Sequence, residues 1–145
     1  MFKTDLTYTN FLGVEVTDTL RFNLTETELL DLVRSDNTFD VSFLTYISNE
    51  RDYAKMMDVL RKLIVVSYGE VSDDGKYFRK SDERALDFVQ SAAYEAFRDQ
   101  LLSDDEGKGF INFIKGVFPA KFVAEMQKQA ILTGDKPTLV TTNNQ

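Results

Sequence analysis

Three residues near the middle of the chain have side chains of the kind that could hold a divalent cation. Glu70, Asp73 and Asp74 supply carboxylates, and Gly75 follows them. A calcium-binding EF-hand needs oxygen ligands at alternate positions and a glutamate closing a loop of about 12 residues, and this spacing does not match. Asp74-Gly75 is instead typical of a β-hairpin turn, because glycine reaches a positive φ angle without a steric clash. We therefore predict a turn without a metal at this position.

A second candidate is a short segment that resembles part of a phosphate-binding loop. It runs from Glu106 to Gly109, with a glycine on each side of Lys108. A phosphate loop requires a longer glycine pattern that follows a strand, and no strand is expected here. Asp104 and Asp105 also bring negative charge to the start of the following helix, where it competes with a phosphate. The segment is therefore interpreted as a helix start without a phosphate ligand.

Catalysis is disfavoured by two absences from the composition. The chain has no histidine and no cysteine, which removes the commonest near-neutral proton carrier, the thiol nucleophile and the commonest zinc ligands. Carboxylate pairs such as Glu15 with Asp18 and Glu50 with Asp58 are ordinary on an acidic surface, and no serine or threonine lies in a nucleophile elbow. We predict a non-enzymatic protein with no catalytic residue, no cofactor and no metal.

The charge and hydropathy of the chain predict that it binds neither nucleic acid nor membrane. Its net charge of −7 repels phosphate, and Lys115, Lys121 and Lys128 are interpreted as a solvated helix face. The longest apolar run, residues 60–66, contains two basic residues and is far shorter than the roughly 20 residues of a membrane helix. The first residues lack the pattern of a signal peptide. We expect the protein to stay in the cytoplasm in which it is made.

The sequence patterns predict a mainly α-helical fold with small β-hairpins, which belongs to the α+β class. Alternation predicts an N-terminal hairpin over residues 3–22, and strand-forming aromatic residues beside Asp74-Gly75 predict a short central hairpin. Thr25 and Glu28 form a capping box, and a second capping box begins at Ser103. Apolar residues at three- and four-residue spacing predict helices at about 26–34, 39–47, 50–67, 82–102, from the second capping box to 117, and 120–132.

The 145 residues are enough for one globular domain with its own core. We expect this domain to span residues 1–132, with the hairpin at 3–22 and a helical body at 25–132. Residues 133–145 contain Gly134, Pro137 and a polar end, so we expect a flexible C-terminal tail that is available to a partner.

The chain has a surplus of aromatic residues, with 12 phenylalanines and 6 tyrosines but no tryptophan. They are densest near the C-terminus, where Phe110, Phe113, Phe118 and Phe122 lie on or beside one predicted helix. One interpretation is that these side chains fill the core. The other is that some of them form an apolar patch that binds another protein. Both can hold for different residues of the same helix.

Several segments together resemble the family of phage tail assembly chaperones. They are residues 8–15, Arg21-Phe-Asn-Leu-Thr25, Ser67-Tyr-Gly-Glu70, Asp74-Gly-Lys76 with Phe78-Arg-Lys-Ser81, and Phe110-Ile-Asn112. The resemblance covers roughly Tyr8 to Pro119 and includes no catalytic motif. It implies a protein in the host cytoplasm that binds the tail tube and tape measure proteins before and during tail polymerisation and leaves before the virion is finished.

Phe110, Phe113, Phe118 and Phe122 are the residues that we predict to contact such clients. Self-association is left open as a further interaction. Two other functions also stay open: a structural virion protein of the tail or head–tail junction, and an acidic host-inhibiting protein. The last would need carboxylates arrayed on one face, whereas here they are spread between the apolar stripes of the helices.

Overall fold

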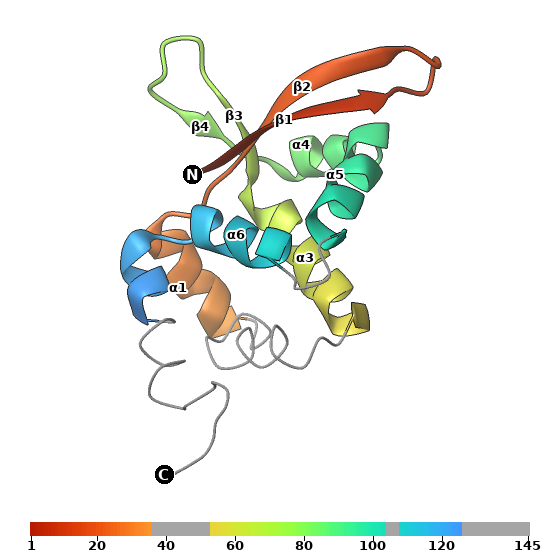
Figure 1. The fold of residues 1–145 in the computed structure, drawn as a ribbon. Coiled ribbons are helices and arrows are strands. Elements are labelled where there is room, and N and C mark those ends of the chain that lie inside the picture. The colour runs from red at the N-terminus through yellow and green to blue at the C-terminus, as the bar shows by residue number, and fades with distance from the viewer. Residues whose placement is uncertain (36–52, 104–107, 126–145) are drawn as a thin grey trace.

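A computed structural model gives the fold of residues 1–35, 53–103 and 108–125 (Figure 1). It is an α+β fold, as the sequence predicts. The elements are β1 (Phe2–Thr9), β2 (Glu15–Phe22), α1 (Glu26–Ser35), α3 (Tyr53–Ser67), β3 (Tyr68–Val71), β4 (Phe78–Arg79), α4 (Asp82–Val89), α5 (Ala92–Leu102) and α6 (Lys108–Val117). The strands extend from one side of the helical part (Figure 1).

The predicted N-terminal hairpin is confirmed as the pair β1–β2. Its register pairs Phe2 with Phe22 at the base and Thr9 with Glu15 near the loop. Successive side chains of a strand point to opposite faces, so the apolar residues at alternate positions share one face. Leu6, Leu20 and Phe22 on that face are buried against the helices.

The two predicted hairpins belong to one antiparallel sheet with the order β1-β2-β3-β4. Among the described residues, strand pairing joins the two hairpins at two residue pairs, Arg21 with Gly69 and Phe22 with Tyr68. Beyond these pairs β2 and β3 diverge (Figure 1). Gly69 has no side chain at the crossing, where a Cβ would lie 2.9 Å from the carbonyl oxygen of Arg79.

The central hairpin is also confirmed, with a loop longer than the Asp74-Gly75 dipeptide alone suggests. The Ser72 amide donates to the Tyr77 carbonyl at 2.9 Å and so closes a loop across residues 72–77. Gly75 has a φ angle of 76°, which is the left-handed conformation expected of a turn glycine. The Asp74 carboxylate accepts hydrogen bonds from the Lys76 amide and the Ser72 hydroxyl, so it serves the turn itself.

The helix starts at Thr25 and Ser81 follow capping chemistry. The Thr25 hydroxyl accepts from the Glu28 amide at 3.2 Å, and the Glu28 carboxylate accepts from the Thr25 amide at 2.9 Å, which confirms the first capping box. The predicted helix at 50–67 is described as α3 from Tyr53 onward. The predicted helix at 39–47, the end of the second capping box and the tail at 133–145 lie outside the described residues.

The prediction of one continuous helix at 82–102 is wrong. Two helices, α4 and α5, are separated at Gln90 and Ser91, and Ser91 has an extended backbone with φ −90° and ψ 161°. Its hydroxyl donates to the Phe88 carbonyl at 2.7 Å, which satisfies a carbonyl at the end of α4. The break lets Phe88 on α4 and Phe97 on α5 both reach the core.

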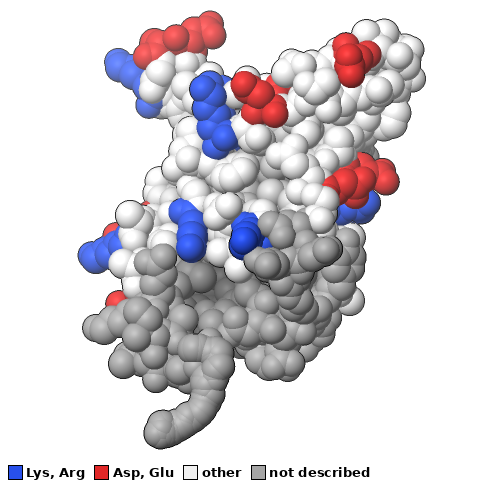
Figure 2. Space-filling model, viewed as in Figure 1, with Lys and Arg blue, Asp and Glu red and all other residues white. Residues whose placement is uncertain are grey.

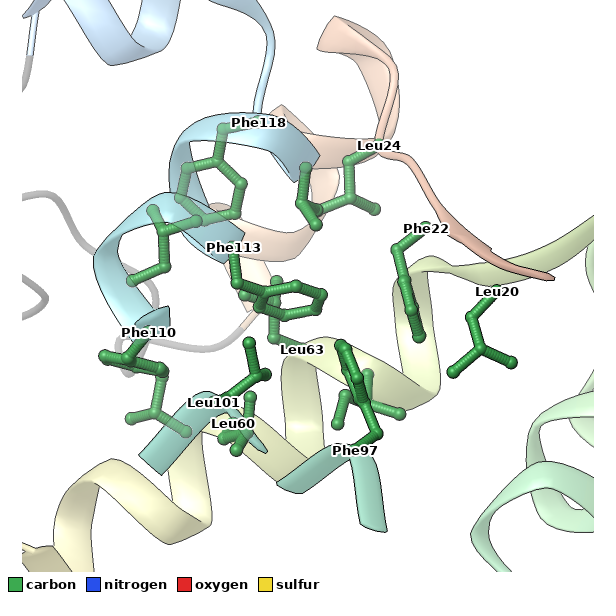
Figure 3. Packing of buried hydrophobic residues seen from close by; sticks show 14 of the residues in the cluster. Leu20, Phe22, Leu24, Leu60, Leu63, Phe97, Leu101, Phe110, Phe113 and Phe118 are labelled. Carbon is green, nitrogen blue, oxygen red and sulfur yellow. The ribbon is translucent and has the colours of Figure 1, made fainter. Parts of the chain in front are cut away.

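A cluster of buried aromatic rings joins the sheet to the helices (Figure 3). Phe22 of β2 stacks on Phe97 of α5 with 4.9 Å between ring centroids, and Phe113 of α6 lies edge-on to both. Phe2 of β1 packs edge-on against Phe113 at 5.1 Å. Aromatic pairs of this geometry contribute about 0.5–1.5 kcal/mol beyond the area that they bury. The cluster therefore fixes the base of the N-terminal hairpin on α5 and α6.

Candidate partner-binding surfaces

The structure buries three of the four phenylalanines predicted to contact a partner. Phe110 and Phe113 are 0% exposed and Phe118 is 3% exposed, whereas Phe122 is partly buried at the edge of the core. The core encloses the first three side chains, so they do not form an exposed apolar patch in this fold. A contact between these residues and a partner stays a prediction.

Neighbouring elements enclose α6 closely, which explains the burial of its aromatic face. A Cβ at Gly109 would lie 2.6 Å from the Leu101 carbonyl oxygen of α5. On the other side, a Cβ at Gly116 would lie 2.9 Å from the side chain of Phe2. The Leu24 amide, just before α1, donates to the Val117 carbonyl at 3.1 Å. Small residues and backbone contacts thus hold α6 against α5, β1 and the chain before α1.

Phe122 lies beside an apolar groove between α1 and residues 119–125, which are helical from residue 120. The groove has a volume of about 270 Å³ and is lined by Leu29, Leu30, Pro119 and Phe122, with charged residues at its rim. The Phe122 ring packs edge-on against Phe118 at 5.3 Å. Because Leu30 is exposed, an apolar side chain of a partner can reach this groove.

The two most exposed large apolar residues of the described chain, Phe11 and Leu12, lie at the free end of the β1–β2 hairpin, next to the exposed Val14. Phe11 is 80% exposed, Leu12 is 88% exposed and Val14 is 51% exposed. We call residues 11–14 the apolar loop. Exposed apolar residues that cluster in this way are typical of an interaction site, whereas scattered single residues need no explanation.

The apolar loop is held in one conformation by hydrogen bonds. The Asn10 side chain accepts from the amides of Leu12 and Val14 at 2.9 and 3.0 Å, and the Asn10 amide donates to the Val14 carbonyl at 2.9 Å. Gly13 has a φ angle of 78° and closes the turn. The loop is therefore ordered before any partner binds, which lowers the entropy lost on binding.

The sequence analysis placed residues 10–13 only within the predicted N-terminal hairpin and missed this surface. The available signal was the residue types themselves, since hairpin turns favour Gly, Asn, Asp and Ser. Phe11 and Leu12 in such a turn have no local structural purpose. Two large apolar side chains at the end of a predicted hairpin indicate a contact outside the domain.

A cavity of about 460 Å³ lies where the two hairpins diverge, beside α4. Tyr8 and Asp18 of the N-terminal hairpin line one wall, and the Tyr8 hydroxyl donates to the Asp18 carboxylate at 2.5 Å. This hydrogen bond, together with burial and the charge of Asp18, raises the pKa of Tyr8 to about 12. The tyrosine therefore stays neutral and holds one carboxylate at the cavity wall.

The opposite wall of the cavity is aromatic and acidic. Tyr68 of β3 stacks on Phe88 of α4 with 4.5 Å between ring centroids. Burial raises the pKa of Tyr68, and the nearby carboxylates of Glu70, Asp18 and Asp87 raise it further. The cavity thus combines an apolar lining with three carboxylates and two arginines, Arg21 and Arg84, so its lining carries one more negative charge than positive.

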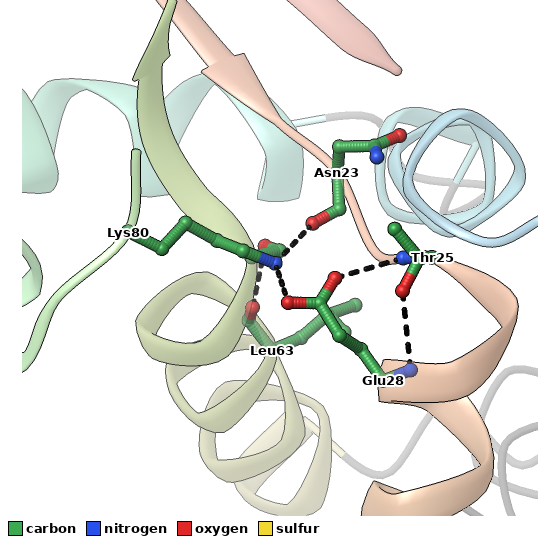
Figure 4. A network of polar contacts seen from close by, with 6 residues as sticks. Asn23, Thr25, Glu28, Leu63 and Lys80 are labelled. Carbon is green, nitrogen blue, oxygen red and sulfur yellow. Dashed lines mark hydrogen bonds and ion pairs between the residues drawn. The ribbon is translucent and has the colours of Figure 1, made fainter. Parts of the chain in front are cut away.

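A lysine links the central hairpin to α1 (Figure 4). Lys80 forms an ion pair with Glu28 at 2.7 Å and donates to the Asn23 carbonyl at 2.9 Å. Partial burial disfavours the ionised form of Glu28, but hydrogen bonds from Lys80 and Thr25 outweigh it and lower the pKa of this carboxyl. The contact fixes the base of the sheet and is not available to a partner.

The remaining charged surface does not point to a ligand. Charged side chains stand in small separate groups on the face in Figure 2, with uncharged surface between them. Within the described ranges, no group of three or more acidic side chains is placed to hold a metal ion. No helix among the described elements is long and apolar enough to cross a membrane.

Comparison with protein families shows the family to which the chain belongs. A family model described as phage tail assembly chaperone matches residues 1–145, the whole chain. The chain therefore belongs to the phage tail assembly chaperone family. No match was found among curated proteins or among solved structures.

Proposed function

We propose that this tail assembly chaperone binds the tail tube and tape measure proteins of its phage before and during tail polymerisation. Family membership supports the general role. The observation that carries the client-binding proposal is the apolar loop, in which Phe11 and Leu12 are 80% and 88% exposed. A loop that is already ordered can cover an apolar segment of a client without first unfolding any part of the chaperone.

The groove beside Phe122 is the second surface in this proposal. It lies on the helical part, away from the apolar loop at the free end of the hairpin (Figure 1). Of the four phenylalanines predicted from the sequence, Phe122 lines this groove, and Phe118 lines a separate pocket beside Met1. Two separate apolar contacts on one client would raise the overall affinity through a higher effective concentration at the second site.

The proposal is tested by co-expressing the tagged protein with the tail tube or tape measure protein of the same phage. We expect wild type to recover each client in a soluble complex, and the double variant Phe11→Ser with Leu12→Ser to lose most of it. Leu86→Ser is the matched control, because Leu86 is also an exposed apolar residue, at 54%, and lies on α4. Phe122→Ser tests the groove and is expected to lower recovery less than the double variant.

Purified virions separate this function from a structural role. A chaperone of this kind is expected to be missing from the finished particle when its proteins are identified by mass spectrometry. Failure to recover either client, together with a fixed copy number in the virion, would replace the proposal with a structural protein of the tail.

A further inference from the structure

We infer that the outer edge of β2 binds an extended segment of a client protein as an additional β-strand, with a lysine or arginine side chain entering the cavity between the hairpins. This inference rests on the proposed function and specifies how the client is recognised. It concerns a backbone surface that is distinct from the apolar loop, although both belong to the same hairpin.

The first support is the alternation of backbone groups along β2. In an antiparallel pair, residues whose backbone groups bond to one neighbour alternate with residues whose groups point to the other side. The Asn10 amide donates to the Val14 carbonyl, so this pair is hydrogen-bonded. Counting along the register from it, the backbone N–H and C=O groups of Thr17 and Thr19 point away from β1. Arg21 has the same orientation, and its pairing with Gly69 of β3 is consistent with it.

The second support is that these outward groups have no partner within the described chain. If the pairing with β3 continued in register, Thr19 would face Val71, but pairing stops at Arg21 and Gly69. No hydrogen bond joins the backbone of Thr17 or Thr19 to any described residue outside the strand pair. Two unpaired residues of a strand form a template for an extended polypeptide, which is the recognition mode of strand addition.

The third support is the cavity beside this edge, which selects the chemistry of the added segment. Side chains that are directly opposite across a strand pair share one face. A residue opposite Asp18 would therefore point toward the cavity, which is also lined by Glu70 and Asp87. Two arginines, Arg21 and Arg84, also line the cavity, and Arg84 pairs with Glu70 at 3.0 Å. The three carboxylates therefore outnumber the guanidinium groups by one. Tyr68 and Phe88 supply an apolar lining, which suits the long stem of lysine or arginine.

The same charges argue against a second copy of this chain as the occupant. A symmetric pairing that matches Thr17 of each copy with Thr19 of the other places Asp18 opposite Asp18, and like charges in that position are destabilising. The net charge of −7 adds repulsion between copies. A client segment with a basic residue opposite Asp18 avoids both of these repulsions.

The outer edge of β1 provides an internal contrast. Alternation leaves its backbone groups outward at Lys3, Asp5, Thr7 and Thr9. Charged residues on an edge strand discourage pairing with another chain, and Lys3 and Asp5 line neither the cavity between the hairpins nor the pocket beside Met1. The two edges of one hairpin are thus matched in geometry and different in their surroundings.

This contrast gives a matched pair of variants. Thr7 and Thr17 face each other and their hydroxyls form a hydrogen bond at 2.8 Å, so Thr7→Pro and Thr17→Pro lose the same side-chain contact. Proline removes the amide hydrogen, and at both positions that amide points away from the partner strand. The two variants differ mainly in which outer edge is blocked.

The probes are overlapping synthetic peptides that tile the tail tube and tape measure proteins of the same phage. We expect one or more peptides containing lysine or arginine to bind, and Thr17→Pro to weaken binding roughly tenfold because a ladder hydrogen bond is lost and its partner is left unpaired. Thr7→Pro should bind as wild type does. In the wild-type protein, amide hydrogen exchange measured by NMR should slow at Thr17 and Thr19 but not at Thr7 and Thr9.

Several results would overturn the inference. If the two proline variants bind the peptides equally well, the client binds elsewhere on the chaperone. The same follows if a bound peptide slows amide hydrogen exchange at other residues but not at Thr17 and Thr19. Capture of full-length clients without binding of any peptide would likewise overturn recognition by strand addition. If neither peptides nor full-length clients bind, the proposed function fails together with the inference.

Discussion

The apolar loop and α6 are similar in composition and opposite in exposure. Both contain large apolar residues at high density, yet Phe11 and Leu12 are almost fully exposed while Phe110 and Phe113 are fully buried. Helix α6 lies among α5, β1 and the chain before α1, whereas the apolar loop extends past the helices at the end of a hairpin (Figure 1). The comparison teaches that the surrounding elements decide whether an apolar segment becomes core or binding surface.

The largest expected difference between these regions is in stability. Phe113→Ala should lower the free energy of unfolding by about 3–5 kcal/mol, because it removes a ring packed against three others and leaves a cavity. Leu12→Ala should change it by no more than about 0.5 kcal/mol, because this side chain contacts mainly water. Urea unfolding followed by circular dichroism measures both changes.

The comparison breaks if the two variants have similar stabilities. A large loss for Leu12→Ala would mean that the loop packs against part of this chain and is not a free surface. In that case the loss of client capture in the Phe11 and Leu12 double variant would report misfolding, so the two measurements must be made on the same preparations.

Glycine has a different role in each region, and this gives a second, smaller effect. Gly109→Ala should destabilise by about 1–3 kcal/mol, since its Cβ would press on the carbonyl oxygen of Leu101, a backbone atom that cannot easily move. Part of this is offset by the better helix propensity of alanine, about 1 kcal/mol. Gly13→Ala has open space around it and should cost about 1–2 kcal/mol from left-handed backbone strain alone.

Asparagine separates these two causes, because it tolerates the left-handed conformation better than alanine does. Thermal unfolding should show Gly13→Asn close to wild type, whereas Gly109→Asn should be at least as unstable as Gly109→Ala. If asparagine restored stability equally at Gly13 and Gly109, the close packing of α5 against α6 would be contradicted.

The local parts of the fold could be predicted from the sequence because their causes are local. The capping box at Thr25 and Glu28 and the left-handed Gly75 depend on neighbours within a few residues. The break at Ser91 could not be predicted, because Ala92 and Ala93 continue the helical pattern. It depends on Phe88 and Phe97 both meeting the core, which is a tertiary effect.

The candidate surfaces were predicted less well, for a related reason. An apolar face covering more than half of a helix is equally typical of a buried helix and of a binding helix. Only the positions of α5 and β1 decide between them, as they do for Phe110 and Phe113. The cavity near Asp18 depends on the pairing of β2 with β3, which are separated by α1 and α3, and no local pattern encodes it.

The base of the sheet contrasts with its free end, because there a polar contact fixes a hairpin to a helix. Glu28→Gln should weaken the pairing with Lys80 and lower the free energy of unfolding by less than about 1 kcal/mol near neutral pH, since the Glu28 side chain is 40% exposed and solvent screens the pair. The pKa of Glu28 is lowered in the folded state. Its contribution is therefore present above the unfolded pKa and is lost as the pH falls through the folded pKa.

The difference in unfolding free energy between wild type and Glu28→Gln, measured by urea titration at a series of pH values, should shrink toward zero in acid. Asp31→Asn is the control on the same helix, because Asp31 pairs with Arg34 at 3.6 Å with both side chains largely exposed, so this variant should change the free energy of unfolding little. A difference for Glu28→Gln that stays constant into acid would mean that the ionised carboxylate is not what links the hairpin to α1. The main contact of Lys80 at this end of the sheet would then be its packing beside Phe78, whose ring centroid lies 6.0 Å from the Lys80 Nζ.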